Sequence, residues 1–150
     1  MSTVLIVDDD ARMREVLSRW LTAAGYETYE APDAETALDL LNAGASNVAL
    51  CDVTMPGKGG LWLVERALVE CPSVAIVLAT GSDNVHPSIS LGGNVVDYLI
   101  KPFERAALLT AVGLAQAWHD SGKRELALDD NAADPLTVWL QGGRLRRSGD

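Results

Sequence analysis

Acidic, hydroxyl and ammonium side chains follow the apolar runs of this 150-residue sequence. Three aspartates, Asp8–Asp10, come directly after VLIV; Asp52 follows VALC, Thr80 ends VAIVLAT and Lys101 follows VVDYLI. Clustered carboxylates repel one another in water and are stabilised by a hard cation such as Mg²⁺, which one or two carboxylates and several waters hold. A carboxylate beside a divalent cation, a lysine and a hydroxyl is equipped to accept a phosphoryl group. These residues predict Asp52 as a nucleophile that becomes an aspartyl phosphate, with Thr80 and Lys101 beside it.

The segment around Asp52 indicates where that carboxylate lies. A short apolar run bounded by a Met-Pro-Gly turn is typical of an interior strand of a parallel sheet. A charge inside such a strand carries a large desolvation cost, so we expect Asp52 at the exposed end of the strand. In open α/β sheets, ligands bind in the crevice at that end. Taken alone, the segment is equally consistent with Asp52 being only the first residue of a loop.

Five candidate strands alternate with helical segments. The strands are expected at residues 4–7, 26–30, 48–51, 74–79 and 95–100. Strict alternation of strand and helix predicts an α/β fold with a parallel sheet between two helix layers. In the doubly wound, flavodoxin-like order 2-1-3-4-5, strands 1 and 3 are neighbours, which brings Asp8 and Asp9 beside Asp52.

Apolar spacing predicts the buried face of each helix. Asp33 after Pro32 is expected to cap the second helix, while Gly25 and Gly44 stand just past helix ends. A fourth helix near residues 84–92 is expected to be short or mobile, because Pro87 and Gly92-Gly93 lower its helix propensity. The expected buried faces are Val16, Leu17, Trp20, Leu21 and Ala24; Ala34, Ala37, Leu38 and Leu41; Leu61, Val64 and Leu68; and Leu108, Ala111, Val112, Ala115 and Trp118.

Composition limits the classes of partner. The length fits one domain with an appendage, and no apolar run approaches the roughly 18 residues that a membrane span needs. The N-terminus lacks a basic leader, and Cys51 and Cys71 have no metal-like spacing, so we expect reduced thiols and a cytoplasmic location without membrane contact. The net charge of -9 arises entirely within residues 1–122, which carry 7 basic and 16 acidic residues. Nucleic acid is therefore not expected to bind this domain.

These motifs, in this order, resemble the receiver domain of two-component response regulators over residues 3 to about 120. The matching residues are the acidic pair in VLIVDDD, Asp52 in CDVTMPG followed by Gly60, Thr80 in VLATG and Lys101 in YLIKPF. Each motif is common alone, whereas their joint order is highly specific. Gly59 departs from the polar residue that the family often has before Gly60, which is expected to loosen the loop after Asp52.

The resemblance implies further roles for individual residues. Asp9, Asp52 and the backbone carbonyl of Thr54 would coordinate Mg²⁺, with Asp8 acting largely through water. Asp10 has no role in the resemblance, and its place just before the first helical segment predicts an N-cap. The family's Lys-Pro peptide is usually cis, which would apply to Lys101-Pro102. Thr80 and Tyr98 would form the switch that responds to phosphorylation.

The resemblance also implies partners and boundaries. A sensor histidine kinase or a histidine phosphotransfer protein would donate the phosphoryl group, and the domain would not be a turnover enzyme. The surface of the fourth helix, fifth strand and fifth helix would change, which allows a phosphorylation-dependent homodimer. Residues 1–122 are expected to form the receiver, and residues 123–150, with Pro135 and a Gly- and Arg-rich end, a partly disordered tail or linker.

Three other interpretations fit the sequence less well. A haloacid-dehalogenase-type phosphatase needs an aspartate two residues after the nucleophile, where this chain has Thr54. The GKGG segment lacks the GxxxxGK[ST] spacing of a nucleotide-binding loop. A phosphorylation-independent binding module is disfavoured by the intact Asp, Thr and Lys set, and labelling by acetyl phosphate with Mg²⁺ separates it from a receiver.

Overall fold

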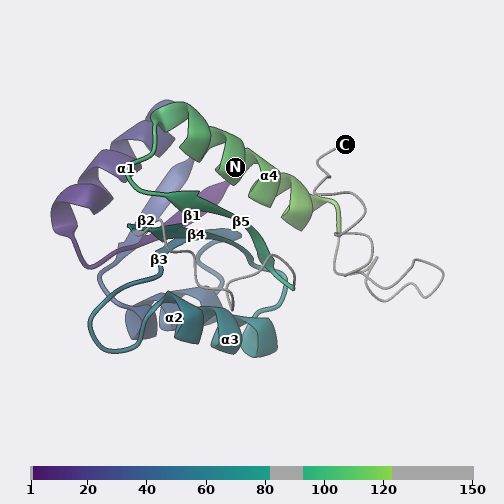
Figure 1. Ribbon diagram of the computed structural model, residues 1–150. Helices are drawn as coiled ribbons and strands as arrows, with labels where there is room; N and C mark the ends of the chain where they lie inside the picture. The colour runs from purple at the N-terminus through teal and green to yellow at the C-terminus, as the bar shows by residue number, and fades with distance from the viewer. Residues whose placement is uncertain (1, 82–92, 123–150) are drawn as a thin grey trace.

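The protein is a five-stranded parallel sheet with helices on both faces (Figure 1). The computed structural model describes residues 2–81 and 93–122. The strand order is β2-β1-β3-β4-β5, which confirms the predicted doubly wound α/β fold. Each strand lies within one residue of its predicted limits at both ends. The elements are β1 Thr3–Val7, α1 Ala11–Ala23, β2 Glu27–Ala31, α2 Ala34–Asn42, β3 Val48–Asp52, α3 Gly60–Glu70, β4 Ala75–Thr80, β5 Val95–Ile100 and α4 Arg105–Asp120.

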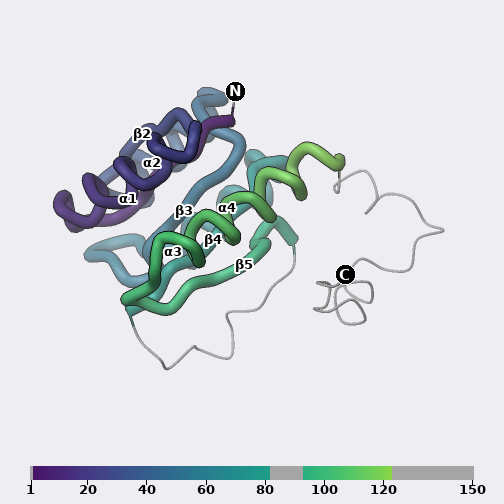
Figure 2. The backbone as a smooth tube through the Cα atoms, turned by 90° about the horizontal axis from the view of Figure 1, so that it is seen from above, coloured from purple at the N-terminus to yellow at the C-terminus, as the bar shows by residue number. Residues whose placement is uncertain are grey.

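An apolar core lies between the sheet and each of its two helix layers. Helices α1 and α4 cover one face and α2 and α3 cover the other (Figure 1), and the same layers are seen from above in Figure 2. Successive strand residues point to opposite faces, so Val4 and Ile6 join the core under α1 and α4, while Leu5 and Val7 join the core over α2 and α3. The carboxyl ends of these parallel strands, which carry the expected site residues, therefore lie together at one edge of the sheet.

The buried faces of α2 and α4 and the predicted helix caps are confirmed. All the residues expected on the buried faces of α2 and α4 are buried. The Asp10 carboxylate accepts hydrogen bonds from the backbone N–H groups of the first turn of α1, and Asp33 does the same for α2. Gly25 and Gly44, just past α1 and α2, have positive φ angles of 99° and 79°, which a residue without a Cβ adopts readily.

The predicted buried faces of α3 and α1 are only partly right. In α3, Leu61 and Val64 are half-buried against the core, as expected. Helix α3 buries Gly60, Leu63 and Ala67, whereas Leu68 is 46% exposed. The sequence LWLV is apolar at four consecutive positions, so more than one helical spacing fits it and periodicity alone does not select the face. In α1, Leu17 and Leu21 are buried as expected, but Val16 and Ala24 are exposed.

Two predictions fall on residues outside the described ranges. These are the short fourth helix near residues 84–92 and the tail at residues 123–150. Within residues 2–81 and 93–122, no helix combines the length and apolarity that crossing a membrane requires.

The start of α3 packs directly on the backbone that follows Asp52. The Gly60 N–H donates to the Val53 carbonyl at 3.0 Å, and a Cβ at Gly60 would lie 2.6 Å from the Asp52 carbonyl oxygen. A Cβ at Gly59 would lie 2.8 Å from the Val53 carbonyl oxygen, so close backbone approach explains a glycine there. The looser loop expected from Gly59 stays a prediction. This contact fixes α3 against the end of β3.

The first testable prediction concerns this contact. Gly60→Ala should lower the free energy of unfolding by about 1–3 kcal/mol, because the new methyl group meets backbone atoms that cannot rotate away. Gly113→Ala is the matched control, since that helical position in α4 has nothing within 4 Å and should gain about 1 kcal/mol from the better helix propensity of alanine. Urea denaturation of both variants measures the difference, and equal effects at the two positions would contradict the packing described.

Candidate phosphoacceptor site

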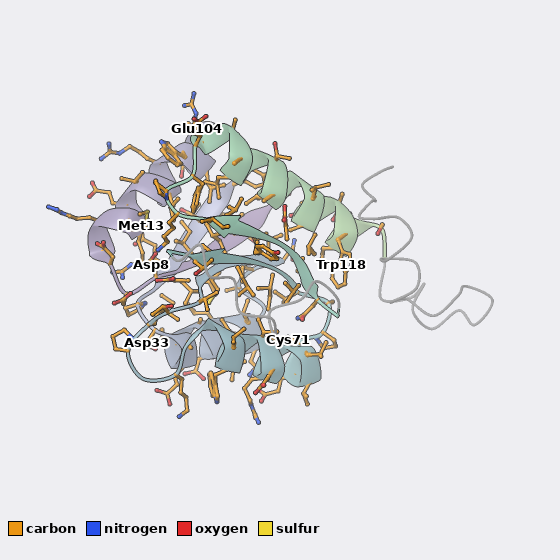
Figure 3. The ribbon with its side chains drawn as sticks, in the orientation of Figure 1. Asp8, Met13, Asp33, Cys71, Glu104 and Trp118 are labelled. Carbon is orange, nitrogen blue, oxygen red and sulfur yellow. The ribbon has the colours of Figure 1, made fainter. Side chains whose placement is uncertain are left out.

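The carboxyl ends of the central strands bring the predicted acidic residues together. Strands β1 and β3 are neighbours with Val7 opposite Cys51, so Asp8 and Asp52 come next to each other as the strands end. One carboxylate oxygen each from Asp8, Asp9 and Asp52 lies within 4.8 Å of the others. In Figure 3, Asp8 lies between the two helix layers, at the side of the molecule where Met13 and Asp33 mark the beginnings of α1 and α2.

Asp52 lies at the end of its strand, as predicted, but the expected exposure of that end is wrong. Asp52 is the last residue of β3 but only 7% exposed, and Asp8 is 3% exposed, while Asp9 is exposed. Buried charges occur in proteins where they are paired and hydrogen bonded, and both conditions are met here. One Asp52 oxygen, Oδ1, accepts the Thr54 backbone N–H at 3.2 Å, and the other faces Lys101.

Lys101 joins the two buried carboxylates. Its Nζ lies 3.0 Å from Asp8 Oδ2 and 3.5 Å from Asp52 Oδ2. The lysine follows β5, and its backbone N–H donates to the Thr80 carbonyl at 2.7 Å, which ties it to the end of β4. The Lys101-Pro102 peptide is cis, as the resemblance implied. Residues far apart in sequence thus form one ionic group.

Burial and neighbouring charges shift the pKa of both partners. Burial, with the Asp8 charge in the same direction, raises the pKa of Asp52, although the Lys101 charge and the Thr54 N–H oppose that rise. For Lys101, burial works to lower the pKa, but the hydrogen bond to Asp8 and the charge of Asp52 outweigh it and the pKa is raised. Lys101 therefore keeps its charge, and the site favours additional positive charge beside Asp52.

Thr80 and Tyr98 are placed by the pairing of β4 with β5. Asp52 pairs with Ala79, so Thr80, which is 6% exposed, lies one residue further along the neighbouring strand. Thr80 pairs with Ile100, and Tyr98 precedes Ile100 by two, so Tyr98 and Thr80 face the same side of the sheet. Tyr98 is partly buried against the core over α2 and α3. The switch role of this pair stays a prediction.

Two contacts to Asp8 were not anticipated from the sequence. The Asp10 backbone N–H donates to Asp8 Oδ1 at 2.9 Å, and Arg14 Nη1 donates to the Asp8 backbone carbonyl at 2.7 Å. The sequence signal for the second contact was the position of Arg14, four residues after the N-cap Asp10. That spacing places Arg14 one helical turn from the loop that carries the aspartates.

The donor set fits Mg²⁺. Three carboxylates converge, two of them buried, and Lys101 is the one cation that contacts the two buried carboxylates within the described part of the chain. Mg²⁺ takes oxygen ligands and keeps waters when few carboxylates are offered, which suits a cluster with one exposed member.

Comparison with known proteins assigns the family. Residues 4–113 match the response regulator receiver domain family, and the chain belongs to that family. It is similar to the transcriptional regulatory protein CseB of Streptomyces avermitilis, with 30% identity over 97% of this chain and 66% of that protein. It is also similar to the aerobic respiration control protein ArcA of Escherichia coli, with 37% identity over 67% of this chain and 42% of ArcA. The chain thus spans less than two thirds of the length of these relatives.

Solved structures show the same fold. A CheY-like receiver domain protein from Methanospirillum hungatei superposes with a TM-score of 0.72, at 28% identity over 83% of this chain and 98% of that chain. The response regulator TrrA of Thermotoga maritima, solved in complex with Mg²⁺ and BeF, has a TM-score of 0.70 at 28% identity, over 77% of this chain and 99% of its own. The chain is therefore a phosphoacceptor receiver domain of two-component signalling, a class that is generally not a turnover enzyme.

The second testable prediction concerns the charge of Asp52. Because the pKa of Asp52 is raised on folding, its contribution to stability is present at low pH and is lost as pH rises through the folded-state pKa. Asp52→Asn should therefore be more stable than the wild type at neutral pH without Mg²⁺, and the difference should shrink as pH falls.

Thermal unfolding with and without Mg²⁺ measures this effect. At about ten times its Kd, Mg²⁺ should stabilise the wild type by about 1.4 kcal/mol and the variant much less. Asp39→Asn, which removes an exposed carboxylate of α2, is the control and should respond to Mg²⁺ as the wild type does. A lower stability of Asp52→Asn without Mg²⁺ would contradict the assigned electrostatics.

Proposed function

We propose that Asp52 is the residue of this receiver domain that accepts the phosphoryl group. The observation that supports this most strongly is the position of Lys101 Nζ, 3.5 Å from Asp52 Oδ2 and 3.0 Å from Asp8 Oδ2. An ammonium group beside the attacking carboxylate can neutralise charge on the phosphoryl oxygens as it develops. Asp52 also ends the central strand β3, at the carboxyl edge of the sheet where ligands of open α/β sheets bind.

The transfer follows from these positions. An Asp52 carboxylate oxygen attacks the phosphorus of a phosphohistidine, the O–P bond forms, the N–P bond breaks, and the imidazole leaves with its electron pair and takes a proton from solvent. Bound Mg²⁺ would neutralise charge on the transferred oxygens. Lys101 holds a second positive charge at the site, and the Thr80 hydroxyl would donate to a phosphoryl oxygen.

The proposed Mg²⁺ ligands are Asp9, Asp52 and the Thr54 carbonyl. Asp8 would act through water, because Oδ1 already accepts the Asp10 N–H and Oδ2 accepts Lys101. The exposed Asp9 has a carboxylate oxygen within 4.8 Å of the other two and can meet a hydrated ion from solvent.

The phosphodonor is a sensor histidine kinase or a histidine phosphotransfer protein. A groove of about 330 Å³ with both apolar and charged walls includes Lys101, which contacts Asp52, and it supports docking of the donor near the site. The groove is lined by Asp10, Arg12, Met13, Val16, Trp20, Lys101, Pro102 and Phe103.

Other interactions of the chain are also proposals. A phosphorylation-dependent homodimer would use residues 84–92, β5 and α4, where Ile100 and Leu114 are exposed. The acidic balance of residues 1–122 disfavours nucleic acid as a partner of this domain. NtrC of Rhizobium meliloti, of which the chain spans 28%, is named a DNA-binding transcriptional regulator.

The domain boundary and the location are proposed on similar grounds. The family match ends at residue 113 and α4 ends at Asp120, which supports a receiver within residues 1–122 and a tail or linker at 123–150. A cytoplasmic location is supported by membership of the response regulators. A phosphorylation-independent module is disfavoured, because Asp52, Thr80 and Lys101 are all present and gathered at one edge of the sheet.

The third testable prediction is the labelling of Asp52. With acetyl phosphate and Mg²⁺, the wild type should gain one hydroxylamine-sensitive phosphoryl group, and Asp52→Asn should gain none. Asp10→Asn is the control, because Asp10 caps α1 and its carboxylate is not a member of the acidic cluster. Intact-mass spectrometry gives the readout, and full labelling of Asp52→Asn would overturn the assignment.

The fourth testable prediction concerns the switch. Phosphate on Asp52 would draw the Thr80 hydroxyl toward it and free space that Tyr98 enters. Beryllofluoride should therefore shift the ring resonances of Tyr98 in the wild type and in Thr80→Ser, which keeps the hydroxyl, but much less in Thr80→Ala. Equal shifts in both variants would show that Thr80 does not couple the site to Tyr98.

A further inference from the structure

Arg14 links the acidic loop to the edge strand of the sheet. Its Nη1 donates to the Asp8 backbone carbonyl at 2.7 Å, and its Nε donates to Glu30 Oε1 at 3.1 Å on β2. The Arg14 side chain is only 17% exposed, whereas that of Glu30 is 42% exposed. The planar guanidinium offers both donors in a fixed geometry, so it holds the two partners at once. The neighbouring ion pair of α1, Arg19 with Glu15, is fully on the surface, with side chains 72% and 67% exposed.

The Asp8 carbonyl belongs to the peptide unit that carries Asp9. Because that unit is planar, fixing the carbonyl of Asp8 fixes the direction of the Asp9 N–H and restricts its Cα. The Asp8 N–H donates to the Ala31 carbonyl at 3.2 Å, and its carboxylate is held by Asp10 and Lys101. Within residues 2–81 and 93–122, no hydrogen bond holds the Asp9 carboxylate in this way. The orientation of Asp9 therefore depends on its backbone, and the Arg14 contact is part of what orients that backbone.

We propose that Arg14, supported by Glu30, is a positioning residue for Mg²⁺ binding. By holding the Asp8 carbonyl, Arg14 keeps the Asp9 carboxylate close to that of Asp52, so that an arriving ion meets the carboxylates already in place. The proposal rests on the proposed role of this cluster as the Mg²⁺ site. Arg14 contacts neither the ion nor the phosphoryl group in this account, and Glu30 acts through Arg14.

The direction in which Mg²⁺ affinity changes when Arg14 is replaced distinguishes a positioning role from simple electrostatic repulsion. A guanidinium near an acidic cluster repels a divalent cation, so removal of its charge alone would tighten Mg²⁺ binding. Loss of positioning weakens binding, and removal of groups that orient metal ligands typically costs 10–100-fold in affinity. A weaker affinity on loss of a positive charge is thus specific to the positioning role.

The test is a Mg²⁺ titration of the full chain. Binding is monitored by ¹H–¹⁵N NMR at the amides of Asp9 and Thr54. Arg14→Met, which keeps an unbranched side chain without donors, should raise the Kd for Mg²⁺ about tenfold. Glu30→Gln should raise it less, and should add nothing in the Arg14→Met background. Arg14→Lys keeps the positive charge but lacks the planar, two-pronged donor geometry of the guanidinium, so it should restore the affinity only in part. Arg19→Gln, which removes an equal charge from the surface of α1, is the control and should leave the Kd unchanged.

Each contrary result has a distinct meaning. An unchanged or lower Kd in Arg14→Met, with or without a loss of stability, would overturn the positioning role while leaving Mg²⁺ binding by the wild type intact. Absence of Mg²⁺ binding by the wild type would overturn the proposed metal site itself. If Arg14→Met fails to fold, Arg14→Lys decides, since it keeps the positive charge and removes only the forked donor geometry: a Kd equal to that of the wild type overturns the proposal.

Discussion

The ammonium group of Lys101 between the carboxylates of Asp8 and Asp52 is the interaction on which the site depends. Both carboxylates are less than a tenth exposed, and two such charges without a partner would strongly destabilise the folded chain. Lys101 offsets part of that cost and leaves a net negative site, which is suited to a cation and then to a phosphoryl group. The same interaction thus stabilises the resting protein and prepares it for the reaction.

Sheet order makes this interaction attainable. Asp8 follows β1, Asp52 ends β3 and Lys101 follows β5. They meet because β1 adjoins β3 while the Thr80 carbonyl of β4 accepts the Lys101 N–H. The close approach of Gly60 to the backbone of Asp52 fixes the other side of the site. Two carboxylates of the cluster are buried and hydrogen bonded, while Asp9, its exposed member, faces solvent.

Much of the fold and the cluster could be predicted from the sequence, because alternation of apolar runs with helical spacing defines the strands to within one residue. The meeting of Asp8 and Asp52 follows from the doubly wound order. Periodicity predicted only part of the buried face of α3, since that segment is apolar on several sides and the backbone contact at Gly60 turns Leu63 and Ala67 fully inward. Nor could it predict the burial of Asp52 or the contact of Arg14 with the Asp8 carbonyl, because both depend on partners brought from distant parts of the chain.

The most direct test of the central claim is a double-mutant cycle between Lys101 and Asp8 in the Mg²⁺-free protein. Lys101→Met alone leaves two buried carboxylates without their cation, whereas Asp8→Asn removes one of them. The free energies of unfolding of the wild type, the two single variants and the double variant should give a coupling of about 1 kcal/mol or more, with Asp8→Asn relieving the loss caused by Lys101→Met. Additive effects to within about 0.5 kcal/mol would show that the ammonium does not hold the carboxylates together, and would contradict this account.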